Sequence, residues 1–219
     1  MTTPAPTGLI RRAADLVDEH FRHLVIPQYF SLGTSSAADR GRPLPYLKVV
    51  TTLVREFGLK TIVEIGTMRH PMIHGLDEYD PKCCIEGHST LFWADTGAEV
   101  FTVDVSARCA EILVGATRTF RNLHVYTADG IWFLKRFEQP IDLLYLDAWD
   151  LVPGLDYAEK HLEAYVAAQP RLSKTCVILI DDTDILNGGK GRLVIPRLIR
   201  DGFELITWGR QALLVREQS

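Results

Sequence analysis

The sequence predicts an α/β fold built on a doubly wound, mostly parallel sheet, and three observations carry this prediction. Apolar runs typical of buried strands alternate along the chain with segments whose apolar residues recur at helical spacing. The run 176–180 is entirely apolar, as expected for a strand in the middle of a parallel sheet. Two later runs, 203–208 and 211–216, alternate apolar and polar residues on either side of Gly209-Arg210, which predicts an antiparallel hairpin.

The composition is that of an ordinary globular protein. Its 219 residues suit one large domain, or one domain with an extension. Hydrophobic residues make up 47% and charged residues 24%, and the formal net charge of -4 disfavours a surface built for nucleic acid or an anionic membrane. We find neither an apolar run of about 18 residues nor a signal-peptide pattern, so we expect no membrane span and a cytoplasmic protein.

The four cysteines are expected to be reduced thiols. Cys83 and Cys84 are adjacent, which suits neither a structural disulfide nor a CxxC metal site. The alternative is a zinc site that combines these two thiols with His70, His74 or His88.

About 60 residues precede the first predicted strand, which is too few for a separate domain. Helical spacing predicts helices over 9–22 and 45–57, and we interpret residues 1–60 as an N-terminal helical cap on the sheet. The remaining elements alternate: strands are predicted at 62–65, 100–103, 122–126, 141–147 and 176–180, and helices at 89–96, 108–120, 131–137, 157–168 and 193–200.

The stretch 61–106 has the order that nucleotide-binding sheets use. A strand stops at Gly66, a helix follows, and a second strand stops at Asp104. A glycine at the strand end lets the backbone approach a ligand closely, and a carboxylate one strand over can accept both ribose hydroxyls.

With its closing hairpin, the chain resembles the class I S-adenosylmethionine-dependent methyltransferases over about residues 48–216. Segment 64–67 (Glu-Ile-Gly-Thr) matches the start of that family's first motif, and segment 87–90 (Gly-His-Ser-Thr) is similar to its end. Residues 68–86 are inserted between the two halves, and we interpret them as a substrate lid loop; the alternative is an embellishment without chemistry. The resemblance implies a Rossmann-like, seven-stranded sheet of order 3-2-1-4-5-7-6 whose last strand is antiparallel, with residues 61–219 forming the S-adenosylmethionine-binding catalytic domain.

The resemblance also implies which residues hold the cofactor. Asp104 is similar to the family's ribose-binding acid, or else it is a charge at a helix N-terminus. Asp129 is similar to the acid that contacts adenine, or else it caps the helix 131–137. Trp132 lies against the adenine or, as is commoner for an aromatic on a helix, in the core. The full implied set is Glu64, Gly66, Thr67, Ser89, Thr90, Asp104, Val105, Asp129, Gly130 and Asp147.

Three carboxylates, Asp147, Asp181 and Asp182, follow the fourth and fifth predicted strands, where doubly wound sheets place their active sites. Carboxylates at such short distances repel one another, and proteins usually compensate this repulsion with a divalent cation. The segments 144–149 and 179–182 resemble the metal signatures of catechol-type and macrolide-sugar O-methyltransferases, which implies Mg²⁺ bound by these three acids. The alternative is that one or two of them cap helices.

The resemblance therefore implies Mg²⁺-assisted O-methylation of a small-molecule hydroxyl in specialised metabolism, with Asp147 among the catalytic residues. Catechol-type relatives carry a lysine base three residues after the first metal-binding aspartate, where this chain has Asp150. His161 on the following helix is the expected replacement, with His88 and His74 as alternatives.

Three other functions stay open: N- or C-methylation without a metal, a non-catalytic or NAD(P)-binding protein, and a relative of the cephalosporin-hydroxylase type. We expect a small-molecule acceptor and no nucleic-acid or membrane partner; a homodimer through the N-terminal helices follows the habit of the family. An apolar acceptor pocket is expected from Tyr29, Phe30, Tyr46 and Tyr79.

Overall fold

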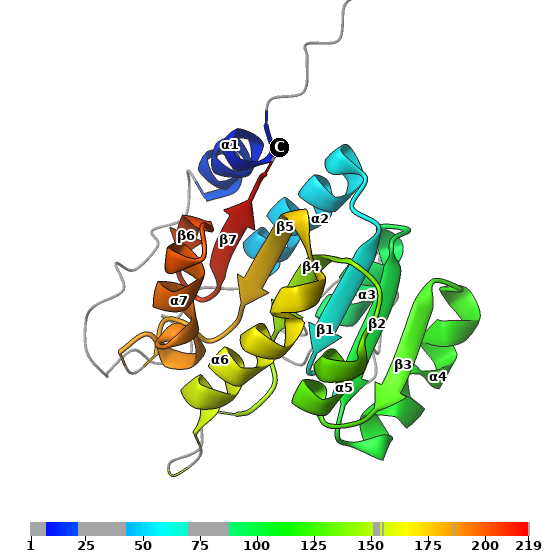
Figure 1. Cartoon of the computed structure of the whole chain (residues 1–219). Helices are drawn as coiled ribbons and strands as arrows, with labels where there is room; N and C mark the ends of the chain where they lie inside the picture. The colour runs from blue at the N-terminus through cyan, green and yellow to red at the C-terminus, as the bar shows by residue number, and fades with distance from the viewer. Residues whose placement is uncertain are drawn as a thin grey trace, which may run out of the picture.

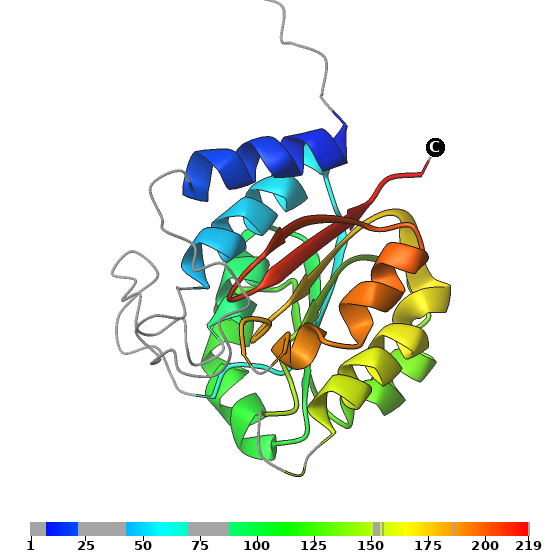
Figure 2. The same cartoon turned by 90° about the vertical axis from the view of Figure 1, so that its left-hand side faces the viewer.

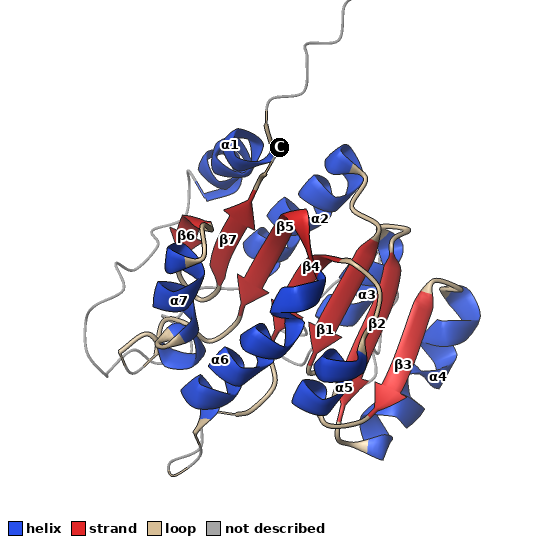
Figure 3. Cartoon of the chain, in the orientation of Figure 1, coloured by secondary structure: helices blue, strands red, loops and turns tan. Residues whose placement is uncertain are grey.

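The computed structural model describes residues 8–21, 43–69, 88–150, 154, 156–185 and 187–218. Its centre is one seven-stranded sheet of order β3-β2-β1-β4-β5-β7-β6, as the resemblance implied (Figure 3). The strands are β1 (Thr61–Ile65), β2 (Glu99–Asp104), β3 (Leu123–Thr127), β4 (Ile141–Leu146), β5 (Leu172–Ile180), β6 (Glu204–Trp208) and β7 (Ala212–Arg216).

Strand pairing follows the predicted directions. β1 pairs in parallel with β2 and with β4, β2 with β3, and β4 with β5. β7 is antiparallel to both of its neighbours, β5 and β6. The predicted parallel sheet with an antiparallel closing hairpin is therefore confirmed, and β7 is an interior strand.

Helices cover both faces of the sheet, as the edge-on view shows (Figures 1 and 2). One apolar core joins one face of the sheet to the first four helices through side chains such as Leu16, Val50, Trp93 and Leu113. A second core joins the other face to the last three helices. The helices are α1 (Leu9–Phe21), α2 (Leu44–Phe57), α3 (Ser89–Asp95), α4 (Ala107–Thr119), α5 (Gly130–Arg136), α6 (Tyr157–Ala168) and α7 (Val194–Arg200), with 3-10 turns η3 (Gln169–Arg171) and η4 (Gly189–Gly191).

Helices α1 and α2, from the predicted cap, pack on one another and on the sheet. α1 contacts α2, β6 and β7, and Arg12 forms a 2.7 Å ion pair with Glu56 of α2. Tyr46 of α2 is buried against Phe21 with ring centroids 4.6 Å apart, so its side chain belongs to the core and not to an acceptor pocket. The remaining cap residues, 1–7 and 22–42 with Tyr29 and Phe30, lie outside the described residues.

Most of the predicted lid loop also lies outside the described residues, since only Met68 and Arg69 of it are placed. The predicted thiols Cys83 and Cys84, with His70, His74 and Tyr79, fall in the same range. Cys109 and Cys176 are placed, and both are buried free thiols. None of the described helices has the length and apolar character that crossing a bilayer requires.

Candidate functional site

A cavity of about 530 Å³ opens at the carboxyl ends of β1, β2 and β4. The strand register builds it, because Ile65 pairs with Val103 on one side and with Leu146 on the other. The residues that follow these strand ends therefore lie side by side. The lining consists of Ile65, Arg69, Val103, Asp104, Val105, Ser106, Arg108, Cys109, Ala128, Gly130, Ala148, Trp149 and Asp150.

Gly66 shapes the floor between the strand ends. Its φ is +93°, a left-handed value that favours glycine, and its N–H donates to the Val103 carbonyl at 2.9 Å. A Cβ at this position would lie 2.8 Å from the carbonyl carbon of Asp147. Gly130 is equally confined, because a Cβ there would collide with the Ile65 side chain. Gly66 thus allows close backbone packing at a smaller pocket beside the cavity, and Gly130 allows close packing on Ile65 at the cavity itself.

Asp104 lies on the cavity wall in a fixed position. Its carboxylate accepts hydrogen bonds from the backbone N–H groups of Ser106 at 2.8 Å and Thr67 at 3.3 Å. The neighbouring Val105 is 72% exposed and offers an apolar surface beside this acid. A carboxylate held by two backbone donors next to an open cavity is suited to accept hydrogen bonds from a diol.

Asp129 is the N-cap of α5, which was the alternative to its predicted contact with adenine. Its carboxylate accepts a hydrogen bond from the backbone N–H of Trp132 at 2.8 Å. Its neighbours Ala128 and Gly130 line the cavity. The Trp132 side chain does not belong to the core, since it is 52% exposed and its ring stacks under the Arg136 guanidinium at 4.1 Å.

Glu64 is fully buried and does not line the cavity. Its carboxylate accepts hydrogen bonds from Ser89 and Thr90 at 2.6 Å each, from Thr102 at 2.7 Å, and from the Trp93 indole at 3.0 Å. Burial raises the pKa of Glu64 to about 7, and these hydrogen bonds oppose the rise. The structure therefore places three side chains expected at the cofactor in a buried network that ties β1 to α3 and β2.

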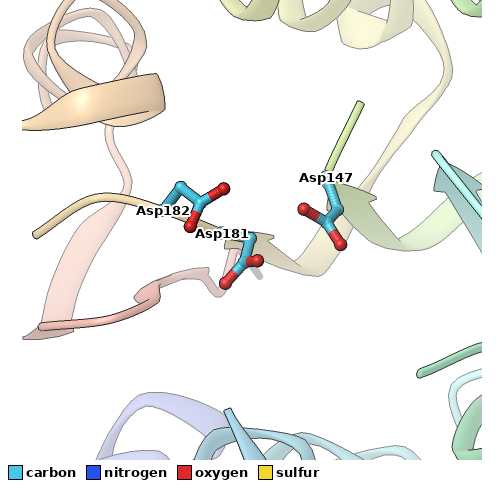
Figure 4. Close-up of side chains that lie close together, drawn as sticks. All are labelled: Asp147, Asp181 and Asp182. Atoms are coloured by element: carbon cyan, nitrogen blue, oxygen red, sulfur yellow. The ribbon is translucent and has the colours of Figure 1, made fainter. Parts of the chain in front are cut away.

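The three predicted metal ligands do come together at the ends of β4 and β5 (Figure 4). Leu146 pairs with Ile180, so Asp147 and Asp181 follow paired positions of neighbouring strands. One carboxylate oxygen of each of Asp147, Asp181 and Asp182 lies within 4.8 Å of the others. Asp182 has a φ of +50°, a strained value for a residue with a side chain, which turns the chain as it leaves β5.

Two cations that the sequence interpretation missed occupy this cluster of acids. Lys190 Nζ lies 2.9 Å from Asp147 Oδ1 and 3.1 Å from Asp182 Oδ2. Arg210 lies 2.9 Å from Asp182 Oδ1 and 3.1 Å from Asp181 Oδ2. We call these five residues the charge cluster. Three carboxylates and two cations leave it a net charge of minus one when all are ionised.

The remaining carboxylate oxygens have neutral donors. Gln211, fully buried, donates from its amide to Asp181 Oδ1 at 3.1 Å and to the Tyr145 hydroxyl at 3.0 Å. The Tyr145 hydroxyl in turn lies 3.3 Å from Asp147 Oδ2. Burial and the Asp147 charge raise the pKa of Asp181 to about 7, and Arg210 opposes that shift.

The charge cluster borders a small pocket of about 60 Å³ that adjoins the larger cavity. Both spaces are lined by Arg69 and Asp150, whose side chains form a 2.7 Å ion pair. Asp150, at the position where catechol-type relatives carry a lysine base, therefore pairs with Arg69, which follows β1 by four residues. This ion pair separates the Asp104 side of the site from the Asp147 side.

The prediction that His161 acts as the general base is wrong. Its side chain is fully buried in α6, and Nδ1 lies 2.6 Å from the Tyr157 carbonyl oxygen, to which it donates. The ring packs edge-on against Trp149 with centroids 5.2 Å apart. Burial, and then the charge of Lys190, lower its pKa to about 3, so the imidazole is too weakly basic to take up a second proton near neutral pH, and it lines neither the cavity nor the small pocket next to it. The alternative His88 is buried at the start of α3.

The fit to a divalent metal can be judged from the donors present. The acids are correctly clustered for Mg²⁺, whose ligands are hard oxygens. However, each of the six carboxylate oxygens already has a partner: four are paired with Lys190 or Arg210, and the other two accept from Tyr145 and Gln211. A divalent ion would raise the net charge of the charge cluster to plus one and would compete with Lys190 and Arg210 for the same oxygens, so the residues as arranged do not fit one.

Comparison with known proteins supports the fold. No family model matches the chain, and no curated protein is similar to it in sequence. Among solved structures, an O-methyltransferase from Bacillus cereus in complex with S-adenosylhomocysteine is 16% identical, with a TM-score of 0.53 over 98% of this chain and 94% of that chain. The methyltransferase PaMTH1 from Podospora anserina, bound to S-adenosylhomocysteine, is 16% identical with a TM-score of 0.56 and complete coverage of both chains.

A third similar structure is the O-methyltransferase TomG from Streptomyces achromogenes in complex with S-adenosylmethionine, 15% identical with a TM-score of 0.54 over 98% of this chain and 92% of that one. At these identities the likeness concerns the fold. The chain therefore has the Rossmann-like fold of the class I S-adenosylmethionine-dependent methyltransferases.

Proposed function

We propose that the protein is an S-adenosylmethionine-dependent methyltransferase that methylates a hydroxyl group of a small molecule. The observation that carries this proposal is the cavity at the ends of β1 and β2, with Asp104 held on its wall and two glycines that admit no side chain beside it. The similar structures named as O-methyltransferases support the choice of oxygen as the acceptor atom.

The residues present fit the adenosyl part of the cofactor. The Asp104 carboxylate would accept hydrogen bonds from the ribose hydroxyls, and Val105 and Gly130 would border the adenine. S-adenosylmethionine bound there would supply an electrophilic methyl group, with its sulfonium sulfur as the leaving group.

The charge cluster would receive the acceptor. The Asp147 carboxylate is 21% exposed and lines the small pocket next to the cavity, so it can hydrogen-bond an acceptor hydroxyl and take its proton as the oxygen attacks. Asp147 is thereby the catalytic residue of this proposal. Its other contacts, to Lys190 and Tyr145, orient the carboxylate.

Calorimetry with S-adenosylhomocysteine and with NADH tests the cofactor. We expect S-adenosylhomocysteine to bind in the micromolar range and NADH not to bind; binding of NADH alone would refute the proposal. Formation of S-adenosylhomocysteine against matched panels of phenols and amines then tests the acceptor atom, and turnover only with amines would replace O-methylation by N-methylation.

A further inference from the structure

We propose that Lys190 and Arg210 are the resident cations of the charge cluster, and that the protein works without a divalent metal at Asp147, Asp181 and Asp182. The role of the charge cluster in a reaction rests on the proposed methyl transfer, whereas the ion pairs themselves are observed independently of that function. The ion pairs of 2.9 to 3.1 Å between the two cations and the three acids perform the charge compensation that a metal would otherwise supply.

Lys190 is built into this position by its loop. Its backbone N–H donates to the Asp182 carbonyl at 3.2 Å, which presses η4 onto the end of β5. At Gly189 a Cβ would collide with that same carbonyl, and at Gly191 it would collide with Ile195. A residue with a side chain at position 189 could not make this approach, because its Cβ would meet backbone, so Gly189 is what lets the loop place the Lys190 ammonium among the acids.

The ammonium has no spare hydrogen-bond donor. Lys190 Nζ lies 3.0 Å from the Asp147 carbonyl oxygen, in addition to its contacts with the Asp147 and Asp182 carboxylates. These three acceptors match the three protons of an ammonium. The side chain is 1% exposed, so a metal that took its oxygens would leave a buried charge without partners, which is strongly unfavourable.

Arg210 compensates the cluster from the opposite side. It lies in the turn between β6 and β7, and its side chain is 11% exposed. The turn is fixed to the acids because the Thr183 N–H donates to the Arg210 carbonyl at 3.1 Å and the Thr183 hydroxyl donates to the Gly209 carbonyl at 2.6 Å. Two separate loops thus deliver one cation each to the same three carboxylates.

Lys190 is therefore a positioning residue, not a catalytic one. The hydrogen bonds and ion pairs of its ammonium go to Asp147 and Asp182, and they hold these two acids in a fixed relation. Asp147 lines the small pocket and, at 21% side-chain exposure against 1% for Lys190, is the member of this pair that an acceptor can reach.

Metal binding by the intact protein is the first test. Mn²⁺, which serves as a paramagnetic stand-in for Mg²⁺, is titrated into the metal-stripped protein and free ion is read by electron paramagnetic resonance. We expect no stoichiometric site with a dissociation constant below about 1 mM, far weaker than the micromolar sites that dedicated oxygen cages reach. A site of micromolar affinity that is lost in Asp182→Asn would overturn the inference.

Removing the lysine is the second test. In Lys190→Met the acids lose a cation, so we expect the thermal unfolding midpoint to fall and the Mn²⁺ affinity to rise at least tenfold. Added Mg²⁺ should raise the midpoint of this variant and leave that of the wild type unchanged. The matched control is Lys160→Met, which removes an exposed lysine paired with Glu163 on α6 and should behave as the wild type does.

These readouts remain decisive if Lys190→Met is poorly folded, because recovery of its cooperative unfolding by Mg²⁺ is itself the expected result. A folded Lys190→Met that gains no metal affinity would overturn the assignment of Lys190. Binding of S-adenosylhomocysteine is measured on the wild type in parallel: its failure would refute the proposed methyl transfer, whereas the metal titrations judge only the charge cluster.

Discussion

Asp104 and His161 show how the same sequence logic succeeds or fails according to where a side chain is placed. Asp104 follows a strand that ends at the cavity, and two backbone donors hold its carboxylate on the wall. His161 lies one turn into a helix whose inner face is formed by Ala158, Ala164 and Tyr165, all buried. The 3.6-residue period puts position 161 on that same face, and this signal was available in the sequence.

Replacing Asp104 by Asn should weaken S-adenosylhomocysteine binding by about ten- to a hundredfold, because a charge-assisted hydrogen bond contributes roughly 1.5–3 kcal/mol. Calorimetry measures the change directly. Asp95→Asn, at an exposed acid of α3 that is paired with Arg55 of α2, is the control and should bind as the wild type does. An unchanged affinity in Asp104→Asn would remove this acid from the cofactor site.

Replacing His161 by Phe should make the protein more resistant to acid. The folded protein lowers the pKa of His161 to about 3, so between pH 6.5 and about 3 the unfolded chain binds a proton that the folded chain does not. Stability is thus lost as pH falls through this window, by about 1.4 kcal/mol per pH unit at this position. Urea unfolding at several pH values should show a shallower acid loss in His161→Phe; equal slopes would mean that the buried imidazole is protonated in the folded state.

The contacts of Glu64 belong to the scale of elements, because one carboxylate joins three of them. Its four donors come from α3 and from Thr102 of β2, while Glu64 itself lies on β1. The short helix α3 has seven residues and no side-chain cap at its start. Helices of this length depend on tertiary contacts for stability, so the Glu64 network is what fixes α3 on the sheet beside the site.

The pH dependence of stability should carry the signature of Glu64. Its pKa is about 7 in the folded protein, above the ordinary value near 4.5, so the folded state binds more protons between these values and stability falls as pH rises from 4.5 to 7. Glu64→Gln places an isostere of the protonated acid at this position. Between pH 4.5 and 7 its free energy of unfolding should therefore fall by about 3 kcal/mol less than that of the wild type.

Urea unfolding of Glu64→Gln from pH 5 to 8, compared with the wild type and with the exposed control Glu163→Gln, measures this effect. Asp181 also has a raised pKa and contributes a fall of the same sign, and it is unchanged in both variants. A wild-type slope in Glu64→Gln would show that the four hydrogen bonds keep Glu64 ionised.

At the scale of the whole molecule, α1 closes the sheet on the side of β6 and β7. Its apolar side chains join the same core as α2 and the central strands, and Leu16 is 2% exposed. This packing lies across the molecule from the cavity at the carboxyl ends of the parallel strands (Figure 1). Stability and ligand binding should therefore respond separately to changes in α1.

Leu16→Ala should lower the free energy of unfolding by about 2–5 kcal/mol, as truncation of a fully buried leucine does. The affinity for S-adenosylhomocysteine should stay within about twofold of the wild type, since sites without shared partners act independently. Asp18→Ala, at an exposed position of the same helix, is the control for stability. A matching loss of affinity in Leu16→Ala would show that α1 is coupled to the cavity.

Most of the fold was predictable because strand and helix periods are local properties of the sequence. Every predicted strand is present, although β5 begins at Leu172 and not at 176, since its first residues pair irregularly with β4 beyond a register shift at Ile141 and Leu143. The clustering of Asp147, Asp181 and Asp182 was predictable for the same reason, as each follows a strand whose neighbour is implied by the topology.

The cations of the charge cluster were not predictable in this way. Lys190 and Arg210 reach the acids from a glycine-rich loop and a hairpin turn, whose docking is decided by tertiary packing. The only local sign was the sequence Gly188-Gly189-Lys190-Gly191, in which three glycines surround a single charged residue. Whether a polar side chain at a strand end faces a cavity or the core, as Glu64 does, is likewise settled by packing alone.

The interior position of β7 has a consequence for biosynthesis. A ribosome delivers β1 to β5 before β7, and until β7 pairs, the strand β5, whose second half is apolar, presents an open edge of unpaired backbone groups. During that interval Arg210 is also absent, so the acids at the tip of β5 repel one another. Nascent chains that contain β5 but not yet β7 are therefore the species most prone to aggregation and to binding by chaperones.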